Sequence, residues 1–118
     1  MREPPAIEGY GGGGFRVAGV WRPGSLLILG DAPRDWCPAA MADLSAADFE
    51  PVLAAPPGAL EFVLLGTGPV QALPPRAVRD ALRAAGLGLE FMATDAAARM
   101  HNVLTQQGRL FATALIAI

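Results

Sequence analysis

Glycine-rich and polar residues follow two of the predicted strands, where an α/β sheet would present them to a ligand. Gly66-Thr67-Gly68 comes directly after the apolar run Leu60–Leu65, and Thr94-Asp95 comes directly after Leu87–Ala93. The carboxyl ends of parallel strands meet at one edge of a sheet, where open α/β sheets bind their ligands. Glycine N–H groups, a helix start and an arginine can together hold a carboxylate or phosphate. The candidate residues for binding a small anion are Gly66, Thr67, Gly68, Thr94, Asp95, Arg99 and Asn102.

Each candidate also has an ordinary structural explanation, which we favour. Glycines after a strand commonly form a strand-to-helix turn, because glycine accepts the positive φ that such turns often need. Asp95, Arg99 and Asn102 follow one another at i, i+4 and i+7, which is the spacing of a solvated helix face with one Asp95–Arg99 pair. Anion binding is therefore an alternative to a purely structural role.

The other chemically capable residues form no recognisable constellation. Cys37 and His101 are the only cysteine and histidine, so the ligand cluster that zinc needs is missing, and an inert thiol is the simpler interpretation of Cys37. The segment 9–14 formally contains G-x-G-x-x-G, but a strand-like sequence follows it where a dinucleotide site requires a helix. We expect no catalytic residues, no metal and no cofactor.

Composition narrows the classes of partner. The chain has 118 residues, 53% of them hydrophobic, which is enough for one domain with a modest core. The net charge of -2 gives no long-range attraction for nucleic acid, and Arg76, Arg79 and Arg83 form only a local basic patch on one helix face. We therefore expect no nucleic-acid partner.

Cysteine usage and hydropathy indicate the compartment. A lone cysteine indicates a reducing environment, because small secreted domains usually carry paired cysteines. The apolar runs Leu26–Leu29 and Leu110–Ile118 are far shorter than the roughly 20 residues of a membrane helix. The N-terminal residues have neither the apolar core of an export signal nor the pattern of a transit peptide. We expect a cytoplasmic protein with no membrane span.

Strands and helices alternate in the second half of the chain. Val78, Ala81 and Leu82 lie on one face of a predicted helix, and Thr94 is a natural N-cap for the next helix. Residues 31–44 have no clear periodicity and are predicted to be an irregular crossover. The predicted elements are strands Ser25–Leu29, Leu60–Leu65, Leu87–Ala93 and Leu110–Ile118, with helices Pro75–Ala85 and Asp95–Gln107.

This order predicts an α/β fold. Strand–helix–strand connections form parallel crossovers, so we expect a three-layer domain with a mostly parallel four-stranded central sheet and an accessory N-terminal β-hairpin layer. The predicted single domain spans residues 1–118, with the hairpin at 6–20 and the sheet with its crossover helices at 25–118.

A series of short motifs, taken in order, resembles a known family. The motifs are Gly9-Tyr10-Gly11, Phe15-Arg16-Val17, Gly24-Ser25-Leu26-Leu27, Leu65-Gly66-Thr67-Gly68, Thr94-Asp95-Ala96-Ala97, Asn102-Val103-Leu104 and Gly108-Arg109. Together they resemble the family of small domains of unknown function that includes mitochondrial respiratory complex I assembly factor 3. The resemblance implies a three-layer α/β domain with a mixed, mostly parallel sheet, and it carries over no catalytic residues.

Two functions follow as expectations. The first is a non-catalytic binding or assembly-factor-like module with a protein partner, linked through the resemblance to respiratory complex assembly. The alternative is a small-molecule or anion-binding protein, or an enzyme, that uses the carboxyl edge of the sheet. The high apolar content is also compatible with a homodimer.

Overall fold

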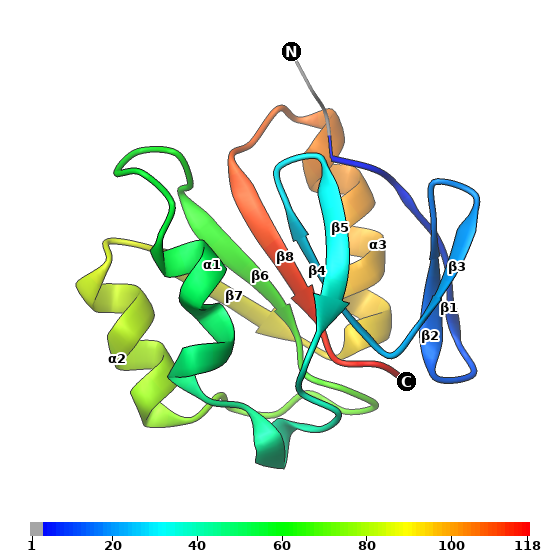
Figure 1. Ribbon diagram of the computed structural model, residues 1–118, viewed down its shortest axis with the longest axis horizontal. Coiled ribbons are helices and arrows are strands. Elements are labelled where there is room, and N and C mark those ends of the chain that lie inside the picture. Colours follow the sequence, from blue (N-terminus) through cyan, green and yellow to red (C-terminus); the bar gives the residue numbers. More distant parts are fainter. Residues whose placement is uncertain (1–3) are drawn as a thin grey trace.

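A five-stranded mixed sheet forms the centre of the protein in the computed structural model, which describes residues 4–118 (Figure 1). The strands lie in the order β5-β4-β8-β6-β7. β6 is parallel to both β7 and β8, whereas β4 is antiparallel to both β5 and β8. The strand bounds are β4 Ser25–Leu29, β5 Ala32–Trp36, β6 Phe62–Gly66, β7 Gly88–Met92 and β8 Phe111–Leu115.

The expected four-stranded, mostly parallel layout is therefore wrong in two respects. Parallel crossovers connect only β6, β7 and β8, where helices separate the strands; no helical crossover joins β4 to either of its neighbours. The fifth strand, β5, lies inside the 31–44 segment predicted to be irregular. Gly30, with φ 65°, turns the chain directly from β4 into β5, and Pro33 is tolerated because β5 is an edge strand.

The N-terminal layer is a three-stranded antiparallel sheet, so the hairpin predicted for 6–20 is incomplete. Its strands are β1 Ile7–Gly11, β2 Gly14–Val17 and β3 Val20–Pro23. Gly12 and Gly13, inside the formal dinucleotide motif, form the turn between β1 and β2, whereas Gly9, Gly11 and Gly14 lie in the strands themselves. The third strand pairs with β2 after a tight turn at Ala18 and Gly19, both of which have positive φ.

Helices and the N-terminal sheet cover the two faces of the central sheet (Figure 1). The helical elements are the 3-10 turns η1 Met41–Asp43 and η2 Ala46–Phe49, and the helices α1 Glu50–Leu53, α2 Arg76–Ala84 and α3 Thr94–Gln106. α1 and α2 pack on one face, and α3 packs on the other beside the N-terminal sheet. Pro51 lies in the first turn of α1, where its missing N–H costs no helical hydrogen bond.

Two hydrophobic cores fill the spaces between these layers. Val63 and Leu65 of β6 point into the core under α1 and α2, whereas Phe62 and Leu64 point into the core under α3. Side chains alternate along a strand, so β6 is buried on both faces and reads as a continuous apolar run. Phe15 of β2 lies in the α3-side core and is fully buried, which joins the N-terminal sheet to the central sheet.

Within residues 4–118, every helix is too short or too polar to cross a membrane.

Candidate functional site

The carboxyl ends of β6, β7 and β8 meet at one edge, and the two predicted loops lie in contact there. The Gly68 N–H donates to Thr94 Oγ1 over 2.9 Å, and the Thr94 N–H donates to the Gly68 carbonyl over 2.9 Å. The Thr94 hydroxyl in turn donates to the Ile116 carbonyl over 2.7 Å. The sequence-based expectation that these two segments adjoin is therefore confirmed by the geometry.

Thr94 does not cap α3 as predicted. The N-cap position is Ala93, and Thr94 is already in the first helical turn. Its hydroxyl bonds to Gly68 and Ile116 instead of to its own helix, and its side chain is fully buried. The tertiary partners of this hydroxyl replace the local capping bond.

Thr67 is also engaged within the fold. Its hydroxyl lies 2.7 Å from the Val70 carbonyl and 3.2 Å from the Met92 carbonyl, and it accepts the Ala72 N–H over 3.1 Å. These contacts close the loop after β6 and join it to the end of β7. The hydroxyl therefore stabilises the loop from inside.

Different constraints require glycine at positions 66 and 68. A Cβ on Gly66 would lie 2.8 Å from Leu115 Cδ2 and 2.9 Å from Thr94 Oγ1, so the site has no room for a side chain. Gly68 has φ 105°, a conformation that L-residues rarely adopt. Both glycines bring the loop close to the start of α3.

Asn102 lies further along α3 and holds β1. Its Nδ2 donates to the Ile7 carbonyl and its Oδ1 accepts the Ile7 N–H, both over 2.8 Å. This two-bond arrangement continues the edge of β1 onto a helix. Asn102 is thus separated in role from the other candidates at the edge of the sheet.

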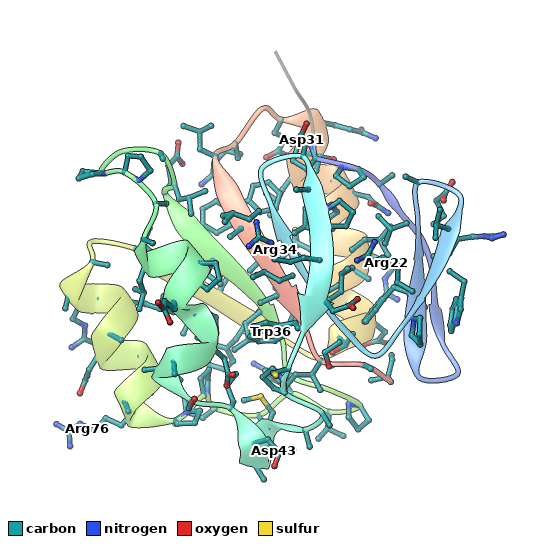
Figure 2. The ribbon with its side chains drawn as sticks, in the orientation of Figure 1. Arg22, Asp31, Arg34, Trp36, Asp43 and Arg76 are labelled. Atoms are coloured by element: carbon teal, nitrogen blue, oxygen red, sulfur yellow. The ribbon has the colours of Figure 1, made fainter. Side chains whose placement is uncertain are left out.

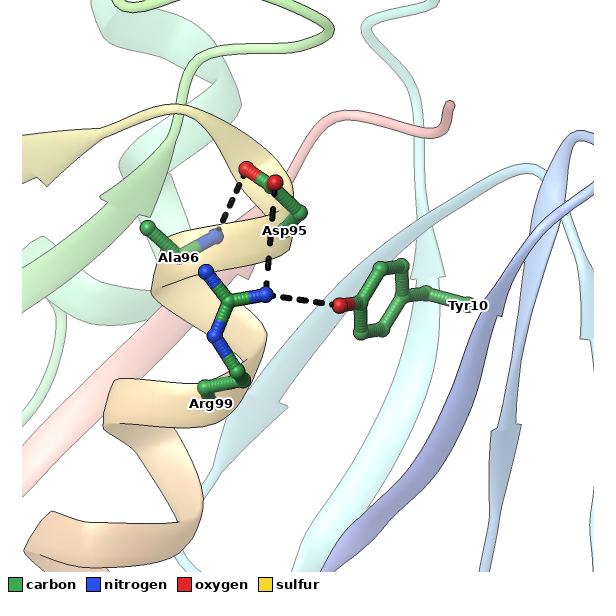
Figure 3. Close-up of polar contacts among 4 residues, drawn as sticks. All are labelled: Tyr10, Asp95, Ala96 and Arg99. Atoms are coloured by element: carbon green, nitrogen blue, oxygen red, sulfur yellow. Dashed lines mark hydrogen bonds and ion pairs between the residues drawn. The ribbon is translucent and has the colours of Figure 1, made fainter.

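Asp95 and Arg99 form an exposed polar cluster with a residue that the sequence analysis missed (Figure 3). Arg99 Nη1 donates to the Tyr10 hydroxyl over 2.8 Å and lies 4.0 Å from Asp95 Oδ2, which confirms the expected Asp95–Arg99 pair. Asp95 Oδ1 accepts the Ala96 N–H over 2.8 Å. We call Tyr10, Asp95 and Arg99 the Tyr10 cluster. No local signal links Tyr10 to α3, because 89 positions separate it from Arg99.

The buried histidine is also fully partnered. His101 Nε2 lies 2.8 Å from the Pro5 carbonyl, which can only accept, so Nε2 carries the proton and Nδ1 accepts from the Thr113 hydroxyl over 2.7 Å. Burial lowers the pKa of His101 below its ordinary value of 6.5, and the Pro5 carbonyl partly opposes this. The neutral ring is therefore a structural link between α3, β8 and the N-terminal segment.

The remaining candidate groups are dispersed. Cys37 is exposed and unpaired, and across residues 4–118 no three His, Cys, Asp or Glu side chains gather as metal ligands. Arg22, Arg34 and Arg76 lie on three separate elements, β3, β5 and α2 (Figure 2). The residues that the structure does expose at the carboxyl edge include Val70 and Leu73, which are 67% and 64% exposed.

The fold and this site define a class: a mixed α/β domain whose candidate binding groups are largely committed to internal hydrogen bonds. A model of the family of proteins of unknown function DUF498/DUF598 matches residues 7–116. The chain is also 38% identical over 110 residues to an uncharacterised protein of Rhodobacter capsulatus. The aligned region covers 93% of this chain and 82% of that protein. The chain belongs to the DUF498/DUF598 family, whose function is unknown.

Solved structures share the same fold. A protein of Bartonella henselae described as an outer membrane protein is 32% identical with a TM-score of 0.83, covering 98% of this chain and 95% of that one. A Bordetella pertussis protein described as a Mth938-like domain is 26% identical with a TM-score of 0.79, covering 95% and 85% of the two chains. The mixed α/β architecture is thus shared with experimentally determined relatives.

Proposed function

We propose that this protein is a non-catalytic binding module that holds a protein partner at the carboxyl edge of its central sheet. The observation that carries the proposal is a contrast between the polar side chains around this edge: some are hydrogen-bonded within the fold, and others are exposed. Thr67, Thr94 and Asn102 have their polar groups engaged within the fold, whereas the side chains of Tyr10 and Arg99 remain exposed.

The exposed chemistry suits a protein surface. Tyrosine and arginine are enriched among the residues that dominate interface energetics, because each combines a large contact area with directional donors. The Tyr10 hydroxyl and the Asp95 carboxylate orient the Arg99 guanidinium before a partner arrives, which lowers the entropy lost on binding. Val70 and Leu73, exposed in the loop that follows β6, add apolar surface at the carboxyl edge of the sheet.

The partner class follows from the family resemblance. Because the motifs resemble the family that includes mitochondrial respiratory complex I assembly factor 3, we propose an assembly role toward a subunit of a respiratory complex. A cytoplasmic location accords with a single exposed thiol, which would persist in a reducing compartment. This assembly role rests on the resemblance alone.

Site-specific crosslinking tests the proposed surface. A photo-crosslinking amino acid replaces exposed Val70, and crosslinking in host cells is compared between the otherwise unchanged chain and its Arg99→Glu variant. We expect one dominant crosslinked protein whose yield falls at least tenfold with Arg99→Glu. Arg83→Glu on α2 is the matched charge-reversal control and should leave the yield unchanged.

The outcome against the proposal is equally specific. If the probe at position 70 captures no discrete protein, or if both charge reversals reduce the yield equally, the carboxyl edge is not the partner surface. A probe in place of exposed Val20 on β3 reports whether a partner binds elsewhere.

Anion binding by the seven candidate residues is the second proposal, because Arg99 is exposed in the second turn of α3. Asp95 weakens it, since its carboxylate already accepts the Ala96 N–H near the helix start. Titration with inorganic phosphate, followed by amide NMR shifts of Gly68 and Ala96, tests it directly. Saturable shifts that disappear in Arg99→Gln would favour the anion site; shifts that stay linear in phosphate would reject it.

A further inference from the structure

The outer edge of β7 has backbone groups that its neighbour leaves unpaired. β7 ends the sheet and pairs only with β6, to which it is parallel (Figure 1). Gly88 N–H donates to the Glu61 carbonyl, and the Met92 carbonyl accepts the Thr67 N–H, so the even-numbered residues face β6. The N–H and C=O groups of Leu89 and Phe91 consequently point outward, because these groups alternate along a strand.

The two edge strands of the sheet, β5 and β7, differ in how well they can pair with an added strand. β5, at the opposite edge, contains Pro33, which has no N–H to offer. β7 contains neither proline nor lysine, and in its sequence GLEFM the small Gly88 and the polar Glu90 alternate with apolar residues up to Phe91, after which apolar Met92 ends the strand. An open edge of this kind is a template for an added strand.

We propose that β7 pairs in antiparallel fashion with β7 of a second copy of this chain, about a two-fold axis at Leu89. The two five-stranded sheets then form one continuous sheet. This register aligns the outward backbone groups of Leu89 with those of its symmetry mate. On the face toward α2 it places Leu89 against Leu89 and Phe91 against Leu87, and all three residues are partly buried apolar side chains.

Charge selects this register over its neighbour. A two-fold axis at Glu90 would place two carboxylates directly opposite each other at the closest approach of the strands, which is destabilising. With the axis at Leu89, Glu90 faces Gly88 of the second copy. Glu90 has no ion-pair partner within residues 4–118 of its own chain.

An arginine lies where the incoming Glu90 would arrive. Gly88 is the register partner of Phe62 on β6, and Arg109 Cζ lies 4.9 Å from the centre of the Phe62 ring. Arg109 uses Nε for Glu61, at 3.4 Å, which leaves its terminal nitrogens for a second carboxylate. Gly88 has no side chain to block the path, and a hollow of about 220 Å³, lined by Phe62, Arg109 and this chain's own Glu90, lies beside it. The two-fold axis therefore creates two symmetric Glu90–Arg109 pairs.

Charge exchange tests the interface. Sedimentation equilibrium of the full chain should give a dimer of the 12.2 kDa chain. Glu90→Arg and Arg109→Glu should each weaken the dimer at least tenfold, and the double variant should return within about threefold of the original Kd. Arg76→Glu, an exposed charge reversal on α2, is the control and should leave the Kd unchanged. Circular dichroism melting identifies any variant that loses its fold.

Amide exchange supplies a readout that needs no variant. In the dimer the Leu89 amide should be protected, and its exchange should accelerate on dilution below the Kd. A chain that stays monomeric at about 1 mM overturns the proposal. A dimer that keeps its affinity in Glu90→Arg with an unprotected Leu89 amide also overturns it.

This interface is separate from the proposed partner surface. Arg99→Glu removes a member of the Tyr10 cluster and should leave the dimer intact, while Glu90→Arg should leave crosslinking from position 70 intact. Failure of one proposal is thereby distinguished from failure of the other.

Discussion

The Thr94 hydroxyl bonds to two segments besides its own helix. It accepts from Gly68 after β6 and donates to Ile116 after β8, in a fully buried position. A buried donor or acceptor that loses its partner retains the whole cost of leaving water. Thr94, one of the seven candidate anion-binding residues, therefore contributes first to stability.

Thr94→Val tests that contribution. Valine keeps the shape and leaves the Gly68 N–H and the Ile116 carbonyl without this partner, so we expect a loss of about 2–4 kcal/mol of unfolding free energy, since each orphaned buried group costs about 1–3 kcal/mol. Urea denaturation measures it, with Thr94→Ser as the control that retains the hydroxyl. A Thr94→Val variant that is as stable as the parent chain would contradict this role of the hydroxyl.

His101 makes stability depend on pH. Burial lowers its pKa in the folded protein below the ordinary 6.5, so the unfolded chain binds the proton more readily. Stability should therefore fall as the pH drops below about 6.5 and continue to fall until the lowered folded-state pKa is reached, by about 1.4 kcal/mol per unit of pKa difference. Above that range the contribution of the neutral ring is fully present.

Comparison with His101→Gln isolates this effect. Urea midpoints between about pH 7.5 and about pH 5 should decline more steeply for the parent chain than for the variant, because glutamine does not titrate. The carboxylates are common to both chains and cancel in the difference. Parallel pH profiles would contradict the assignment.

At the scale of elements, α3 is the connector of the molecule. Its buried face packs on the central sheet, while Asn102 holds β1 by two hydrogen bonds to Ile7. The Tyr10 cluster makes a second contact between the same helix and strand. The position of β1 thus depends on helix side chains that lie 89 and 95 positions away in the sequence.

Asn102→Ala should loosen β1 selectively. We expect a loss of about 1–3 kcal/mol, because the Ile7 N–H and carbonyl lose their partner in a partly buried site. Amide exchange should rise in β1 and change little in β6. Tyr10→Phe removes only an exposed hydrogen bond and should cost less than about 1 kcal/mol. A uniform rise in exchange across both strands would contradict a local role.

At the scale of the whole molecule, the two sheets share one core. Phe15 and Val17 of the N-terminal sheet pack in the same cluster as Leu26 and Ile28 of the central sheet. A three-stranded sheet of this size has little apolar surface of its own to bury. We infer that neither sheet folds independently, and a single domain over residues 1–118 stays a prediction.

The two tryptophans provide a probe for each sheet. Trp21 is in β3 of the N-terminal sheet and Trp36 is in β5 of the central sheet. The Trp36→Phe variant therefore reports on the N-terminal sheet, and the Trp21→Phe variant reports on the central sheet. Fluorescence unfolding curves from the two variants should each coincide with far-UV circular dichroism of the same variant. A Trp21 transition that clearly precedes its circular dichroism curve would indicate two cooperative units.

Local patterns in the sequence determined the elements after Leu60 closely. Helical spacing at Val78 and Leu82, and turn signals at Gly66 and Gly86, predicted β6, α2, β7 and α3 to within a few residues. The Asp95–Arg99 pair followed from the same periodicity. These features depend on neighbours within a few positions, which a single sequence records.

Only the tertiary structure decided which strands pair and which polar groups remain available. The direction of β4, the existence of β5, the bond from Arg99 to Tyr10 and the replacement of the Thr94 cap all join distant segments. Several groups could bond to the same hydroxyl, and several strands could pair with the same strand edge. Which of them does so depends on how the layers pack. A local pattern contains no information about that competition, so the sequence alone could place the candidates at one edge without showing that most were already engaged.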